Sequence, residues 1–177
     1  MLAAATLAVS LAATAPVPTP IGVGPRFAPP PRVPAACAHG PLRGRYRAHV
    51  ELFALRRVAL LPPGIGIGLP REIRGARVVA GGCRAPARTL DPTGVVEFDR
   101  AGLTVGDLFA AWRMPLGVRR LLSFRGAVSA WVDGRRRRGD PRSIPLRDGA
   151  EIVLEIGGYV PPHSFYVFPP RGRARRL

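Results

Sequence analysis

The sequence of 177 residues contains no lysine, asparagine or glutamine, so all 27 of its basic side chains are arginines. This selective absence is typical of base-composition bias in a GC-rich genome. The net charge of +16 therefore does not by itself indicate an anionic partner. No apolar run reaches the roughly 20 residues that a membrane-spanning helix needs, and no transmembrane span is predicted.

Histidine is also scarce, with only His39, His49 and His163 in the chain. None of them lies near a glycine-flanked serine of the nucleophile-elbow type, which argues against Ser-His-Asp catalysis. A paired-carboxylate site could be formed from Asp91, Glu97 and Asp99. However, Glu97 and Asp99 share one face of a short strand with arginines nearby, which favours charge pairing on a solvated face. The sequence therefore predicts no enzyme and no cofactor.

The N-terminal part of the chain lacks the pattern of a folded domain. Residues 1–15 are uncharged and resemble the apolar region of a signal peptide, with small residues at 13–15 as a cleavage site. Residues 16–44 are rich in proline and alanine and predict a semi-rigid linker. These features predict an extracellular or cell-envelope protein. The alternative is a disordered N-terminus on a cytoplasmic protein.

Only two cysteines occur, Cys37 and Cys83. They lack the C-x-x-C spacing of zinc and redox sites. In an exported protein an even number of cysteines predicts a disulfide, here Cys37–Cys83. Two free buried thiols are the alternative.

Residues 45–158 predict a single α+β domain with a small, mostly antiparallel or mixed sheet and one main amphipathic helix. Residues 159–177 form a proline-rich, basic tail. Thr104 and Asp107 have the spacing of a helix-capping box. The apolar residues of the helix then fall on one face: Val105, Leu108, Phe109 and Trp112.

Strands are predicted on both sides of this helix. Residues 48–55 and 95–98 precede it, and residues 128–132 follow it with an Asp133-Gly134 hairpin turn. Residues 150–156 alternate apolar and polar side chains, as in a strand with one buried face. The helix, the hairpin and the strand after Asp148-Gly149 resemble the β-grasp arrangement of ubiquitin-like and transcobalamin-tail domains. That likeness implies a fold and no function.

A second resemblance involves the stretch before the helix. Its elements are Cys83, Arg88-Thr89-Leu90-Asp91, Gly94, Val96-Glu97-Phe98-Asp99 and the helix from Thr104 to Trp112. Together they resemble an uncharacterised family of small exported bacterial and archaeal proteins with the pattern Cys-x4-His-Thr-His-Asp, then Gly-x-Ile-His-Val-Glu. The resemblance extends over roughly residues 45–170.

The histidines of that family are largely replaced in this chain. Arg88, Leu90 and Glu97 stand where the family has histidine, and only His49 remains of an upstream pair. Clustered histidines suggest a metal site in the family. The remaining candidates here are His49, Asp91 and Glu97. Because an arginine beside a divalent metal is electrostatically unfavourable, the resemblance implies that this member has lost the site.

The sequence thus predicts a non-catalytic exported binding or structural module with an unknown protein or glycan partner. One alternative is a basic protein that binds a polyanion, a cell-wall polymer or nucleic acid. Its contact candidates are Arg135, Arg136, Arg137 and Arg138, which could equally be a solvated hairpin tip. Arginines gathered on one face would favour this alternative. A second alternative is residual metal binding.

Overall fold

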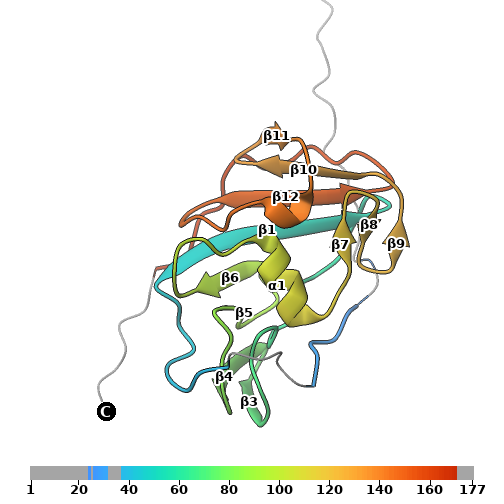
Figure 1. Cartoon of the computed structure of the whole chain (residues 1–177). Helices are drawn as coiled ribbons and strands as arrows, with labels where there is room; N and C mark the ends of the chain where they lie inside the picture. The colour runs from blue at the N-terminus through green and yellow to red at the C-terminus, as the bar shows by residue number, and fades with distance from the viewer. Residues whose placement is uncertain (1–23, 25, 32–36, 171–177) are drawn as a thin grey trace, which may run out of the picture.

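The computed structural model describes residues 24, 26–31 and 37–170. The signal-like segment at 1–15 and the last arginines of the basic tail lie outside the described residues. Within them, one mixed sheet and one α-helix form the body of the molecule, as the predicted α+β class requires (Figure 1).

The main sheet has seven strands in the order β11-β10-β12-β1-β6-β5, with β2 paired to β1. Its strands are β1 (Tyr46–Ala54), β2 (Arg57–Val58), β5 (Ala87–Thr89), β6 (Val95–Phe98), β10 (Val128–Val132), β11 (Arg135–Arg137) and β12 (Glu151–Ile156). The central pair, β1 and β12, is parallel, and the other pairs are antiparallel. This parallel pair brings the start and the end of the folded domain together.

Smaller elements surround this sheet. A hairpin of β3 (Arg71–Arg74) and β4 (Arg77–Gly81) lies between β2 and β5 in the chain. Three short strands form a meander after the helix: β7 (Leu116–Gly117), β8 (Arg120–Leu121) and β9 (Phe124–Arg125). A single 3-10 turn, η1 (Pro141–Ser143), precedes β12.

Helix α1 (Val105–Trp112) covers one face of the sheet (Figure 1). The predicted capping box is present: the Asp107 amide donates to Thr104 Oγ1 at 3.3 Å, and the Thr104 amide donates to Asp107 Oδ2 at 2.7 Å. The helix ends at Arg113, which adopts a left-handed conformation with φ of 59°. Its predicted apolar face is buried against the sheet.

Part of the predicted linker packs against the domain. The Trp112 Nε1 group donates to the Ala28 carbonyl at 3.1 Å, and the Phe27 ring lies edge-on to Trp112 with centroids 6.0 Å apart. The predicted disulfide between Cys37 and Cys83 is present and closes a separation of 46 residues. It joins the end of the linker region to the loop after β4.

Strand β12 departs from the one-sided burial that its alternating pattern predicts. All six of its residues are buried, and Glu151 and Glu155 are only 1% and 2% exposed. The cause is a segment without regular secondary structure, residues 159–170, here called the C-terminal strap. It contacts the face of the sheet opposite α1, where Val160 packs in a cluster with Phe53 and Val153. The local pattern of β12 cannot show that another segment packs on its second face.

None of the helices in the described part of the chain has the length and apolar character required to cross a bilayer.

Candidate metal centre

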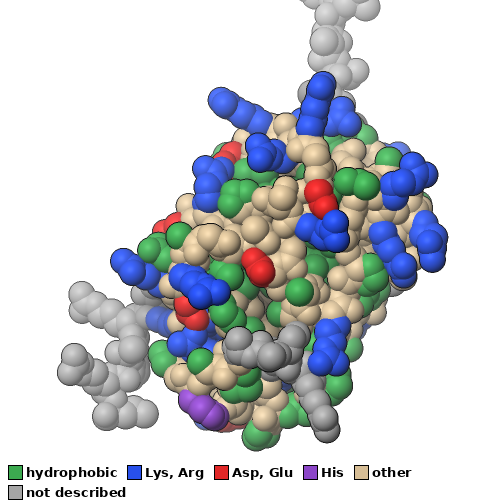
Figure 2. Space-filling model, in the orientation of Figure 1, with side chains coloured by type: hydrophobic (Ala, Val, Ile, Leu, Met, Phe, Trp, Pro, Cys, Tyr) green, Lys and Arg blue, Asp and Glu red, His purple; other side chains and the backbone are tan. Residues whose placement is uncertain are grey.

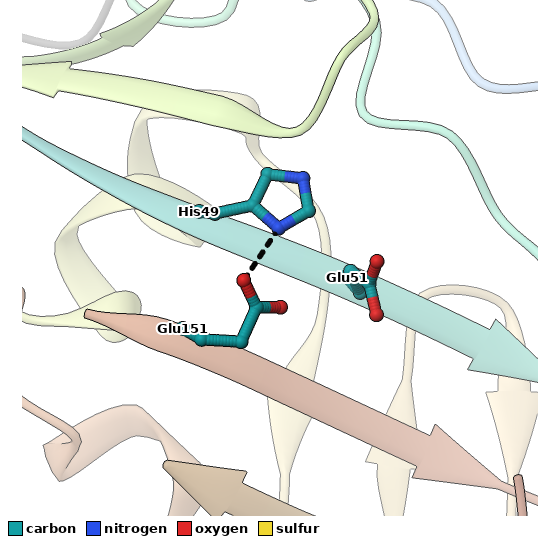
Figure 3. A group of neighbouring side chains, drawn as sticks. All are labelled: His49, Glu51 and Glu151. Carbon is teal, nitrogen blue, oxygen red and sulfur yellow. Dashed lines mark hydrogen bonds and ion pairs between the residues drawn. The ribbon is translucent and has the colours of Figure 1, made fainter. Parts of the chain in front are cut away.

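A group of ligand-type side chains lies under the C-terminal strap, on the sheet face opposite α1. The parallel register pairs His49 of β1 with Glu151 of β12, and the two-residue period of β1 places Glu51 on the same face. His49, Glu51 and Glu151 each offer one ligand atom, and these three atoms lie within 4.8 Å of one another (Figure 3). These three residues are here called the His-Glu-Glu cluster.

The orientation of the His49 ring follows from its two partners. Nε2 lies 2.7 Å from the Thr93 carbonyl oxygen, which can only accept, so Nε2 carries a hydrogen and donates it. Nδ1 therefore faces Glu151 Oε2, at 2.8 Å. Metal-binding histidines commonly donate one ring N–H to a carbonyl while the other nitrogen holds the metal. His49 has this arrangement, and Nδ1 is the ring nitrogen that could hold a metal ion.

A proton is held between His49 and Glu151. Burial lowers the pKa of His49, but the hydrogen bond and negative charge of Glu151 outweigh it, and the net pKa is raised. Burial likewise raises the pKa of Glu151, against the lowering effect of His49. With Nε2 protonated, one further proton lies between Nδ1 and Oε2. A metal ion could take its place, because both atoms are good ligands once deprotonated.

The second carboxylate oxygen of Glu151, Oε1, is buried and has no hydrogen-bond partner among the described residues. In Figure 3 it points to the side of Glu51. Leaving a buried acceptor unpaired costs about 1–3 kcal/mol, and more for a charged group. A cation held between the two carboxylates would satisfy this atom.

The loop before β6 holds His49 in place. Gly94 has φ of +85°, and a Cβ at this position would lie 2.7 Å from His49 Nε2. Only glycine therefore allows the loop to approach the ring closely enough for the Thr93 hydrogen bond. Asp91 accepts from the Thr93 amide at 3.2 Å and pairs with Arg77, so it orders the same loop.

Two of the three predicted metal candidates are therefore not ligands in this cluster. Asp91 stabilises the loop, and Glu97 accepts the Gly44 amide at 2.9 Å. Only His49 belongs to the cluster. Asp91 lies in the turn between β5 and β6, and Glu97 lies on β6. The Asp91 carboxylate pairs with the Arg77 guanidinium, and the Glu97 carboxylate accepts a backbone amide.

Arg88, which replaces a histidine of the resembled family, is completely buried. Its guanidinium donates to both Asp99 oxygens, at 3.0 and 2.9 Å, and to the Ala85 carbonyl at 3.1 Å. The predicted pairing of Asp99 with a nearby arginine is thus present, but within the protein and not on a solvated face. Arg88 has its own counter-ion and is not part of the His-Glu-Glu cluster.

Sequence reasoning missed Glu51 and Glu151. Glu51 could have been found, since His49-Val50-Glu51 places two ligand types on one face of a strand. Glu151 could not, because it lies 102 residues from His49 and joins it only through the β1–β12 register.

One imidazole and two carboxylates suit zinc and similar divalent transition metals. In a tetrahedral site with bonds near 2.0–2.1 Å, ligand atoms are about 3.3 Å apart. The cluster spans up to 4.8 Å, so metal binding requires the Glu51 carboxylate to turn inward. Glu51 is only half-buried, and its carboxylate lies at the end of a flexible side chain, so it can turn inward easily.

The arginine candidates Arg135, Arg136, Arg137 and Arg138 are all exposed, the first three along β11 at the edge of the sheet. On the face that Figure 2 shows, arginine side chains lie along the top, left and right edges and over the middle, and they do not gather in one patch. This spread does not add to the argument for a polyanion site, which stays a prediction from the sequence.

In comparisons with known proteins, no family model, curated protein or solved structure matches the chain.

Proposed function

We propose that this protein is a non-catalytic, exported module that binds a divalent transition-metal ion, of which zinc is the best representative, at the His-Glu-Glu cluster. One observation carries the proposal: the buried Oε1 of Glu151, which has no hydrogen-bond partner in the described part of the chain, lies beside a His49 ring that is already oriented for ligation. Imidazole favours zinc over magnesium and calcium, which prefer oxygen ligands alone.

Charge balance supports the same proposal. With a proton on each ring nitrogen of His49 and both carboxylates ionised, the cluster has a net charge of −1 in a largely buried position. A divalent ion that displaces the Nδ1 proton brings two positive charges to two carboxylates and a neutral imidazole, so the net charge becomes zero. Buried carboxylates gain most from such neutralisation because water cannot solvate them.

Three further proposals concern the setting of the site. A β-grasp-like fold is supported by the antiparallel β1–β6 pair before α1 and by the late strand β12, which enters the sheet beside β1. Relationship to the resembled exported family is supported by the motifs around Cys83 and Thr104. A location outside the cytoplasm is supported by the disulfide, since disulfides persist in oxidising compartments.

The test is isothermal titration of the full, oxidised chain with Zn²⁺ after treatment with a chelator. One ion per chain is expected. Glu151→Gln should weaken zinc binding at least a hundredfold, because it removes a ligand charge at the centre of the cluster. The matched control is Glu72→Gln, since Glu72 is an exposed glutamate paired with Arg74 outside the cluster. Equal zinc affinities for the wild type and Glu151→Gln would exclude the site, as would a wild type that binds no zinc.

A further inference from the structure

The C-terminal strap crosses the sheet directly over the His-Glu-Glu cluster. His163 of the strap places Nδ1 at 3.0 Å from both carboxylate oxygens of Glu51. Three residues later, the Tyr166 ring stacks on the His49 ring with centroids 3.7 Å apart and planes at 12°. Two strap side chains therefore contact two of the three cluster residues.

From these contacts we infer that His163 is a fourth protein ligand and that the strap closes over the bound ion. This inference rests on the proposed function, since it concerns the same site. A second imidazole completes a set of two histidines and two glutamates. Four protein ligands are typical of structural zinc sites, whereas catalytic zinc keeps a position open for water or substrate. The ion is therefore sequestered and not exposed to a substrate.

His163 is well placed for this role although it lies outside the cluster itself. Its side chain is 66% exposed, and among the described residues it hydrogen-bonds to the Glu51 carboxylate. When Glu51 turns inward to bind the ion, the His163 ring loses that partner unless it follows. Following Glu51 brings an imidazole nitrogen toward the same ion, so one movement supplies two ligands.

The strap is anchored on both sides of His163. Before it, the Val160 amide donates to Glu155 Oε1 at 3.2 Å, and the Val160 side chain is buried. After it, the Phe168 ring lies under the Arg47 guanidinium at 5.1 Å, and Arg47 Nη1 donates to the Pro169 carbonyl at 2.8 Å. His163 thus lies in the middle of a segment with fixed ends.

Two features of the strap allow it to dock and to lift without a large cost in free energy. Prolines at 161, 162, 169 and 170 restrict the backbone at both ends, which lowers the entropy lost when the strap docks. Within the described residues the strap takes no part in a β-ladder. Side-chain contacts and a few hydrogen bonds hold it, so it can lift without disrupting the sheet.

The test compares wild type, His163→Ala and His39→Ala, all as full oxidised chains. His39 is an exposed histidine outside the cluster, so its variant controls for loss of a surface imidazole. His163→Ala should lower the affinity for Zn²⁺ at least tenfold, whereas His39→Ala should match the wild type. With Co²⁺ in place of zinc, the visible absorption should be intense and tetrahedral in the wild type. It should weaken in His163→Ala, where water replaces the lost ligand.

A second measurement follows the strap itself. Phe165 is 71% exposed and offers chymotrypsin a cleavage point in the strap. Zn²⁺ should slow cleavage there in the wild type and in His39→Ala, but much less in His163→Ala.

The outcomes separate the two proposals. If wild type and His163→Ala bind Zn²⁺ with equal affinity and give the same Co²⁺ spectrum, the strap is only a cover. The inference is then overturned while the proposed function stands. If the wild type binds no Zn²⁺, the proposed function fails and the inference fails with it.

Discussion

Glu155 is the second carboxylate that the C-terminal strap buries, and no ion pair neutralises it among the described residues. Burial raises its pKa to about 7, although the hydrogen bond from Val160 acts in the opposite direction. No cation contributes to this shift, in contrast to Asp99. Burial also raises the pKa of Asp99, but the hydrogen bonds and charges of Arg88 and Arg84 outweigh it and give a net lowering. The pKa shifts of Glu155 and Asp99 thus have opposite directions because, of the two, only Asp99 has arginine partners.

The first prediction concerns the pH dependence that Glu155 creates. Between its ordinary pKa of 4.5 and its folded pKa of about 7, the folded state keeps a proton that the unfolded state has lost. Stability from this group therefore falls as pH rises through that window. The total effect is about 3 kcal/mol. Glu155→Gln should remove it, so the variant gains about 3 kcal/mol relative to wild type between about pH 4 and pH 8.

Urea unfolding of the wild type and of Glu155→Gln, between about pH 4 and pH 8, measures the difference in their free energies of unfolding. Glu72→Gln, at an exposed position, is the control and should follow the wild type. A gap between wild type and Glu155→Gln that stays constant with pH would contradict the assigned shift.

Helix α1 is the element in which local sequence and structure agree best. Its start is determined by the reciprocal hydrogen bonds of Thr104 and Asp107, and its buried face by the spacing of its apolar residues. Both signals lie within about three turns of one segment, where neighbours in sequence are neighbours in space.

The second prediction tests this cap. Thr104→Ala should lower the free energy of unfolding by about 1 kcal/mol, because the Asp107 amide loses the Thr104 hydroxyl as an acceptor. Thr104→Ser keeps the hydroxyl and should remain near the wild-type value. Denaturant melts followed by far-UV circular dichroism provide the comparison. Equal losses in the serine and alanine variants would show that the methyl group, and not the cap, is responsible.

Strand β12 is the element for which local sequence was insufficient. Its alternation correctly marks Ile152, Leu154 and Ile156 as the side toward the helix core. The other side carries Glu151 and Glu155, which alternation alone assigns to solvent. They are buried because the strap, which follows β12 after Gly157 and Gly158, folds back over the sheet. Nothing in the spacing of β12 encodes that return.

At the scale of the whole molecule, the Cys37–Cys83 disulfide joins the N-terminal segment to the β-rich body. The chain has two cysteines, so this is its one possible intrachain disulfide, and it links residues 46 positions apart in the sequence. In the chain-entropy model a loop of this length stabilises the folded state by about 4 kcal/mol.

The third prediction follows from that constraint. Reduction, or the double substitution Cys37→Ser with Cys83→Ser, should lower the free energy of unfolding by about 4 kcal/mol. Differential scanning calorimetry with and without reductant measures the shift in Tm. The double variant controls for reductant, since its own Tm should not respond. An unchanged wild-type Tm on reduction would show that the bridge does not constrain the unfolded chain as described.

The sequence by itself determined the α+β class, the capped helix, the strands at 95–98 and 128–132, the Asp133-Gly134 turn and the cysteine pair. The elements and the turn depend on the local spacing of residues. The disulfide follows from the number of cysteines, because two cysteines can pair with each other in only one way. Only the tertiary structure decided the candidate site. His49 and Glu151 are 102 residues apart in the sequence and meet through the parallel register of β1 and β12, and the strap brings His163 to Glu51. Contacts of this kind depend on which strands pair and in what register, and no local pattern in this chain specifies either.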